Sequence, residues 1–280
     1  MKPRQVVQLL FIASFAVTAT VTTGCGSVSA ACETLGVCDP PPPPPLVVHV
    51  LADPSEGTTV SVTDVSTTLD AALAVIFRRP GSSLHVWVMG NEPAATKEVS
   101  PPVVSDIQTS SAPDRVRRQR IDDTVRRLKT QLMDAYAPFF SGKRPRKSPL
   151  AESITKIALS DDFREGQRIL IVATDGRQVS FVDMECRPPD FTSFSKALHD
   201  NDVLQPKVLA GFSIVMTRFE LVEVAGNRCP ATVSSNRKIE ALWRESLAQA
   251  GASQALFLAG NPTASVLDSL VSAKQEAASR

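Results

Sequence analysis

Three short segments, far apart in the chain, place oxygen-bearing side chains at the ends of predicted strands or at the start of a predicted helix. They are Asp53-Pro54-Ser55-Glu56-Gly57, Ser148-Pro149-Leu150-Ala151-Glu152 and Thr174-Asp175-Gly176. Ligands of an open α/β sheet collect at the carboxyl ends of its strands, so we expect these segments to meet. Carboxylate, hydroxyl and water oxygens suit Mg²⁺, Mn²⁺ or Ca²⁺ better than softer metals. The sequence therefore predicts a hard-cation site formed by Asp53, Ser55, Ser148 and Asp175.

Each segment also has an ordinary structural explanation. Asp53 and Ser55 belong to residue types that cap backbone N–H groups in turns and at helix starts. Ser148 alone is typical of a helix N-cap, and Asp175-Gly176 alone is typical of a tight turn. Only the combination, in this order and at these boundaries, favours a shared site.

The elements that must position these residues alternate between strand and helix. We predict strands at 46–52, 84–89, 168–173, 208–215 and 255–258, and helices at 65–77, 114–136, from 149 onward, 191–199 and 239–250. Ser66 or Thr67 is the expected cap of the first helix. This alternation predicts a doubly wound, mostly parallel α/β sheet flanked by helices. Residues 91–112 are expected to form an exposed loop, and residues 261–280 a C-terminal tail that is a loosely docked helix or disordered.

The segments resemble the metal-ion-dependent adhesion site of the von Willebrand factor A (vWA) domain, and the resemblance covers residues 46–260. The matching order is Asp-x-Ser, then Ser-Pro-Leu-Ala-Glu-Ser-Ile, then Ile-Val-Ala-Thr-Asp-Gly. It implies that Asp53 and Ser55 form the first loop, that Ser148 takes the place of the usual threonine, and that Asp175 is the late aspartate. Such a site binds Mg²⁺ and leaves a position for a partner's Asp or Glu. The chain departs from the pattern at Gly57, where the family has a second serine ligand.

The N-terminus predicts export. Lys2 and Arg4 precede a short apolar stretch, residues 6–21, which is typical of a secretory signal peptide rather than of a membrane span. Residues 21–25 resemble a bacterial lipobox, with Thr22 where leucine is usual, and predict a signal peptide over 1–25 with lipidation of Cys25. Gly26 resembles the sorting position of lipoproteins sent to the outer membrane. The alternative is cleavage near residues 29–31, which would give a soluble periplasmic or secreted protein.

Residues 26–45 are a predicted linker. It ends in six prolines, Pro40 to Pro45, which favour an extended and stiff polyproline II spacer.

The four cysteines other than Cys25 suit an oxidising compartment, and three pairings are open to them. We prefer a disulfide between Cys186 and Cys229, because each follows a strand candidate, residues 179–184 and 208–224 respectively. Cys32 and Cys38 would then form the other disulfide.

Composition excludes few functions. A net charge of +1 gives no argument for nucleic-acid binding, and none is expected. Two basic clusters, residues 115–129 and 143–147, are explained by solvated faces or by a basic rim that attracts an acidic partner.

The histidines His49, His85 and His199 stand isolated in the sequence, and no phosphate-loop, zinc-protease or nucleophile-elbow motif occurs. We therefore expect no enzyme, with an unrecognised secreted hydrolase as an alternative.

These observations together predict a lipoprotein of the bacterial cell envelope that carries a vWA-like domain. It is expected to bind a protein partner, as adhesion proteins do, through Mg²⁺ or another divalent cation. The other alternative is a scaffold subunit of an envelope complex that recognises its partner without metal, because Gly57 removes one ligand.

Overall fold

The computed structural model describes residues 44–105, 114–160, 167–184, 188–219 and 233–278. All of them belong to one compact unit, residues 43–280. The predicted signal peptide, the lipidation site Cys25, most of the linker and the four disulfide candidates Cys32, Cys38, Cys186 and Cys229 lie outside the described residues. Within the described part of the chain, no helix combines the length and the apolar character needed to cross a membrane.

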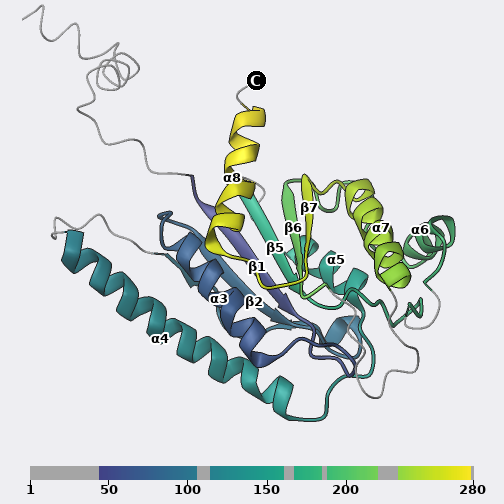
Figure 1. The fold of residues 1–280 in the computed structure, drawn as a ribbon, viewed down its shortest axis with the longest axis horizontal. Helices are drawn as coiled ribbons and strands as arrows, with labels where there is room; N and C mark the ends of the chain where they lie inside the picture. Colours follow the sequence, from purple (N-terminus) through teal and green to yellow (C-terminus); the bar gives the residue numbers. More distant parts are fainter. Residues whose placement is uncertain (1–43, 106–113, 161–166, 185–187, 220–232, 279–280) are drawn as a thin grey trace, which may run out of the picture. The chain divides into compact units, whose positions relative to one another are not determined.

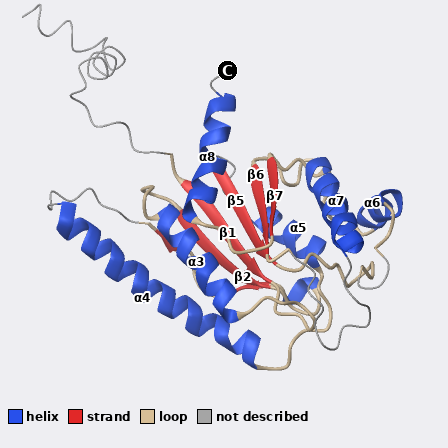
Figure 2. Cartoon of the chain, viewed as in Figure 1, coloured by secondary structure: helices blue, strands red, loops and turns tan. Residues whose placement is uncertain are grey.

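A seven-stranded sheet lies at the centre of this unit (Figure 2). Five strands run parallel to one another: β1 (Leu46–Ala52), β2 (Ser83–Val88), β5 (Gln167–Ala173), β6 (Phe212–Thr217) and β7 (Gln254–Leu258). Two short strands, β3 (Lys97–Glu98) and β4 (Val103–Val104), pair antiparallel with β2. The strand order is β3-β2-β1-β5-β6-β7. After β1 the chain adds β2 on one side of it and later β5 on the other, so the order in which strands are added reverses between β1 and β5. Doubly wound sheets bind ligands at such a reversal.

Helices cover both faces of the sheet (Figure 1). One face packs against α3 (Val62–Ile76), α4 (Asp114–Ser141) and α8 (Ala264–Ala278), and the other against α5 (Leu150–Ser160), α6 (Phe191–Asp200) and α7 (Val233–Gln249). A short 3₁₀ turn, η1 (Pro93–Ala95), precedes β3. Because both faces are covered, all seven residues of β1 are buried, which explains its continuous apolar run. The predicted doubly wound α/β fold, of the Rossmann-like or vWA-like kind, is confirmed.

Several element boundaries differ from the predictions. Helix α3 begins at Val62, and its cap is Ser61 rather than Ser66 or Thr67, because Ser61 and Asp64 form a reciprocal capping box. Strand β6 begins at Phe212 rather than at residue 208. The region expected to be a loop after β2 contains η1, β3 and β4 up to residue 105. Two-residue strands carry too little hydrophobic alternation to be recognised in a sequence.

The C-terminal residues form a helix, which is one of the two expected alternatives, but the first half of this helix is packed more firmly than expected. They form α8, in which Leu267, Leu270 and Val271 are at most 3% exposed. These three side chains belong to the same apolar core as α3 and β1. The close packing was not anticipated because small and polar residues surround a short apolar stripe in this segment.

Candidate functional site

Asp53 connects all three predicted segments. It follows the last residue of β1, is fully buried, and its backbone N–H donates to the carbonyl of Ala173 at the end of β5 (3.0 Å). Its Oδ1 accepts a hydrogen bond from the N–H of Ser55 (3.0 Å). Its Oδ2 accepts from the hydroxyls of Ser148 (2.8 Å) and Thr174 (3.0 Å). A single carboxylate at the reversal between β1 and β5 therefore holds the three loops together.

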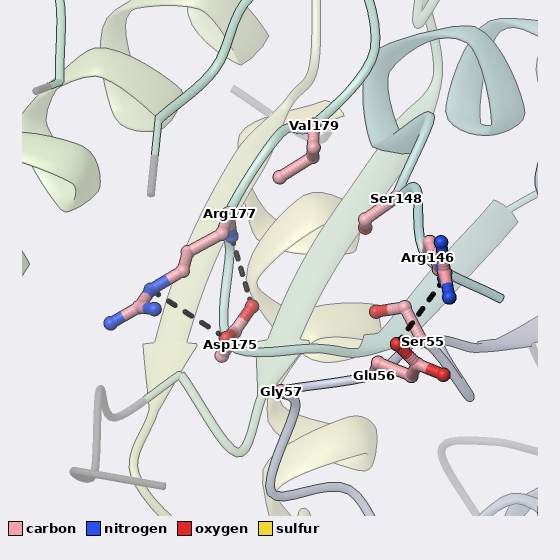
Figure 3. A pocket seen from close by; sticks show the side chains of 8 residues that line it. All are labelled: Ser55, Glu56, Gly57, Arg146, Ser148, Asp175, Arg177 and Val179. Atoms are coloured by element: carbon pink, nitrogen blue, oxygen red, sulfur yellow. Dashed lines mark hydrogen bonds and ion pairs between the residues drawn. The ribbon is translucent and has the colours of Figure 1, made fainter. Parts of the chain in front are cut away.

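Three of the four predicted site residues line one small cavity (Figure 3). Ser55, Ser148 and Asp175 form its walls together with Glu56, Gly57, Arg146, Arg177 and Val179. Asp53 is not among the lining residues, but it accepts a hydrogen bond from the hydroxyl of Ser148, which is one of them. The cavity volume is about 40 Å³, whereas a single water needs roughly 10–15 Å³ of such space. It has room for a few waters or for a hydrated metal ion.

Ser148 is not the N-cap of helix α5, the structural role that is typical of a serine at this position. Helix α5 begins at Leu150, and the N–H of Ala151 in its first turn donates to Oε1 of Gln178 (2.8 Å). Ser148 instead pairs through its backbone with Val179, with N···O distances of 3.1 and 3.0 Å. This pairing directs the Ser148 hydroxyl toward Asp53. Gln178 was not identified in the sequence, and Thr174, although it belongs to the third segment, was not among the predicted site residues. Only the fold brings these two side chains to their partners.

Asp175 is a buried carboxylate with a raised pKa. Burial raises the pKa of Asp175 from 3.8 to about 7, and the nearby Asp53 carboxylate adds to the increase. Arg177 opposes the shift, since its N–H donates to Oδ1 of Asp175 (3.0 Å) and its Nε lies 3.8 Å from Oδ2. In Figure 3 the carboxylate lies between the Arg177 guanidinium and the two serines. Arg177 was not recognised from the sequence, although it directly follows the Asp175-Gly176 pair.

Two glycines shape the loops around the cavity. Gly176 has φ +80°, and an added Cβ there would collide with the ring of Phe219. Its carbonyl accepts a hydrogen bond from the indole N–H of Trp243 on α7 (2.7 Å), which fixes the loop that carries Asp175. Gly57, where the vWA pattern has serine, has φ +90°. L-amino acids with a Cβ rarely adopt this conformation, so the loop is built for glycine.

The basic cluster at 143–147 borders the cavity, as the rim hypothesis anticipated. Arg146 lines it, with its Nε 3.9 Å from a Glu56 carboxylate oxygen. Arg144 donates from its Nε to the carbonyl of Pro54 (2.7 Å), and Lys147 pairs with Glu92 (3.1 Å). Part of this cluster therefore stabilises the loops, while Arg146 faces the cavity.

The donor chemistry fits a hydrated hard cation. Within the described residues, no group of three or more His, Cys, Asp or Glu side chains is placed to hold a metal. The predicted residues offer two carboxylates and two serine hydroxyls, and the further carboxylate in the lining, that of Glu56, pairs with Arg146. Mg²⁺ is usually bound by one or two carboxylates and keeps several waters, whereas zinc sites use Cys and His. Gly57 supplies no side-chain oxygen, and Arg177 offsets part of the charge of Asp175.

A second polar cluster lies on β1, β2 and β3. The rings of His49 and His85 stack with their centroids 4.8 Å apart. Nδ1 of His85 lies 3.0 Å from a Glu98 carboxylate oxygen, and its Nε2 lies 3.3 Å from the hydroxyl of Ser83. The two histidines lie within the sheet as expected, but they are not isolated. Parallel pairing of β1 with β2, which places His49 opposite His85, was not visible in the sequence.

Comparisons with known proteins give structural likenesses alone. No protein-family model matches the chain, and no curated protein matches it. An aerotolerance-related membrane protein from Bacteroides fragilis is 13% identical with a TM-score of 0.42, over 82% of this chain and 97% of that one. BatB from Bacteroides thetaiotaomicron is 14% identical with a TM-score of 0.41, over 84% and 100%. The PilB minor pilin from Streptococcus sanguinis is 7% identical with a TM-score of 0.48, over 86% and 62%. At these values the likenesses assign neither a family nor a function.

Proposed function

We propose that this chain is a vWA-like protein-binding module and that the cavity beyond β1 and β5 is its recognition site. The observation that carries the proposal is the arrangement around Asp53. One buried carboxylate joins three loops at the reversal of the sheet, and two hydroxyls and a second carboxylate are left facing a cavity. Turn formation alone would not require these groups to converge.

In this proposal Ser55, Ser148 and Asp175 hold a Mg²⁺ ion, and Asp53 contributes through water. When bound, the ion supplies a positive centre that a carboxylate oxygen of the partner's Asp or Glu completes. Asp53 orients the Ser148 hydroxyl, and Arg177 holds the Asp175 carboxylate in place. Arg146 at the rim attracts an acidic partner.

Calorimetric titration of Mg²⁺ and Mn²⁺ into the full chain tests the cation. We expect binding that weakens about tenfold or more in Ser148→Ala, because the variant loses a ligand and a hydrogen bond to Asp53. Ser269→Ala, at an exposed position on α8, is the matched control. A pull-down from native envelopes, with and without chelator, then tests partner capture. If the chain binds no cation and Ser148→Ala still captures the partner, the metal-independent scaffold is the correct function.

We also propose that the chain is anchored in the bacterial envelope, in the outer membrane, by lipid on Cys25. The proposal rests on the lipobox-like segment and the proline-rich spacer that separates it from the domain. Metabolic labelling with a palmitate analogue should mark the wild-type chain but not Cys25→Ser. Export without labelling would instead support the soluble periplasmic or secreted form.

The histidine cluster favours one further candidate function, a hydrolase. Ser83, His85 and Glu98 have the order of nucleophile, base and orienting carboxylate that acyl-transfer sites use. Ser83 is only 6% exposed, which leaves little access for a substrate, and binding therefore remains our conclusion. A fluorophosphonate probe that labels the wild-type chain but not Ser83→Ala would establish the hydrolase.

A further inference from the structure

An apolar groove lies at the opposite end of the sheet from Asp53. It has a volume of about 630 Å³ and lies between α4 and residues 100–104. Strand β4 at its edge pairs with Ser83 and Leu84, at the beginning of β2, whereas the cation site lies beyond the strand ends. Figure 1 shows α4 running along the β2 side of the sheet. The apolar lining consists of Phe77, Pro101, Pro102, Val103, Val104, Leu128 and Leu132.

The groove is accessible. Val104 is 59% exposed, although it is a large apolar side chain on a sheet edge, and Pro101 and Pro102 are also exposed. A volume of this size accommodates several side chains of a ligand, since binding pockets commonly measure roughly 300–1,000 Å³. The lining residues from positions 100–104 carry no charge.

Arginines follow the flank of α4 that faces the groove. Thr124 and Gln131 line the groove, and Arg120 and Arg127 precede them by four residues each, on the same side of the helix. Both arginines are exposed, and neither makes an ion pair or hydrogen bond within the part of the chain that the structure describes. The nearby acid Asp123 instead faces Arg126, at 3.7 Å. An apolar groove thus has a positively charged rim.

We propose that this groove docks an acidic segment of a partner protein that carries apolar anchor residues. Its apolar side chains would fill the space between Val104 and Leu128, and its carboxylates would pair with Arg120 and Arg127. Complementary charge of this kind sets partner choice and association rate. A membrane suits the groove less, because the apolar atoms lie in a hollow that a flat lipid surface does not reach. The proposal is independent of the cation site.

Selection of peptides from a random phage-displayed library on the full chain tests the proposal. We expect enriched peptides in which Asp or Glu flanks Leu, Ile or Phe. A synthetic copy of the most enriched peptide should bind about tenfold or more weakly to Val104→Glu and to the double variant Arg120→Glu/Arg127→Glu, and its affinity should fall as salt is added. Leu159→Glu and Arg126→Glu are the matched controls, because Leu159 is 71% exposed on α5 and Arg126 lies away from the groove.

Three results would overturn the proposal. The first is the absence of acidic peptides among those selected, or peptide binding that Val104→Glu leaves unchanged. The second is binding to phosphatidylglycerol vesicles that the double arginine variant loses while no peptide is selected, which would make the surface a membrane contact. The third is a dimer of the chain that Val104→Glu dissociates, which would make a second copy the occupant. Circular dichroism of each variant confirms that it is folded.

Discussion

At the scale of single residues, the candidate site depends on two buried carboxylates. Asp53 is compensated by three hydrogen bonds, and Asp175 by the N–H and the guanidinium of Arg177. An ionised carboxylate is costly to bury unless its partners replace the lost water, which explains the raised pKa of Asp175. A divalent cation in the cavity would favour the ionised form and lower this pKa again.

The raised pKa of Asp175 predicts how stability depends on pH. The pKa of Asp175 is about 7 in the folded chain, whereas the ordinary value of an aspartate, which applies to the unfolded chain, is 3.8. Between pH 3.8 and pH 7 the folded state therefore holds a proton that the unfolded state has released. The free energy of unfolding must therefore fall as the pH rises through this range, by on the order of 4 kcal/mol. Asp175→Asn, which keeps the shape and loses the charge, should flatten this decline. Urea denaturation at pH 5 and pH 8 measures both proteins.

Magnesium provides the complementary measurement. At pH 8 it should raise the free energy of unfolding of the wild-type chain and have a smaller effect on Asp175→Asn, because the ion stabilises the charged carboxylate. If the wild-type chain and Asp175→Asn lose the same stability between pH 5 and pH 8, Asp175 is not the group that causes the pH dependence.

Gly57 permits a test of the departure from the vWA pattern. Because its φ is +90°, Gly57→Ser should destabilise the fold by about 1–2 kcal/mol without increasing Mg²⁺ affinity. Gly57→Ala is the matched variant, since it introduces the same Cβ without the hydroxyl. Urea denaturation and calorimetry compare the two. A tighter Mg²⁺ complex in Gly57→Ser than in Gly57→Ala would show that the hydroxyl reaches the ion after all.

The sequence predicted some of these residues and not others for a physical reason. Asp53 directly follows the apolar run of β1, and Asp175 follows that of β5 after one intervening residue, Thr174. The carboxyl ends of such buried parallel strands meet at one edge of the sheet. Arg177 and Gln178 belong to a loop that returns to the start of α5, and neither periodicity nor composition indicates where an irregular loop goes. Their roles therefore emerged only from the structure.

At the scale of elements, α3 determines the geometry after the first site loop. Its true start at Val62 leaves a short turn between Ser55 and the Ser61 cap. We predict that Ser61→Ala lowers the free energy of unfolding by about 1 kcal/mol, because the N–H of Asp64 and the Asp64 carboxylate both lose their bond to the Ser61 hydroxyl. Ser66→Ala, at the cap position expected from the sequence, should have almost no effect. A reversed ranking in chemical denaturation would place the cap where the sequence suggested.

Element types were easier to predict than element ends. The long strands are buried on both faces and read as continuous apolar runs, and α4 carries its apolar stripe over many turns. The cap of α3 was misplaced because several hydroxyl residues follow one another near its start. Hydrogen bonding with Asp64, three residues after Ser61, selects among them.

At the scale of the whole unit, the C-terminal helix completes one of the two cores. Leu267, Leu270 and Val271 of α8 pack with residues of α3 and β1, so the face of the sheet that α3 covers is closed only when α8 is present. The sequence suggested an appendage here because three apolar residues among small and charged ones give a weak signal. The contribution of a short helix depends on the surface that receives it, which the sequence does not display.

This arrangement predicts that α8 is required for stability and not merely tolerated. Leu267→Ala should lower the free energy of unfolding by about 2–5 kcal/mol, because it removes a fully buried side chain and leaves a cavity. Ser269→Ala, on the exposed side of the same helix, should change it by less than about 0.5 kcal/mol. Urea denaturation of the full chain measures both. A chain shortened to residue 263 that unfolds at the wild-type urea concentration would show that α8 adds nothing to the core, and the domain would then end near residue 260, as the sequence suggested.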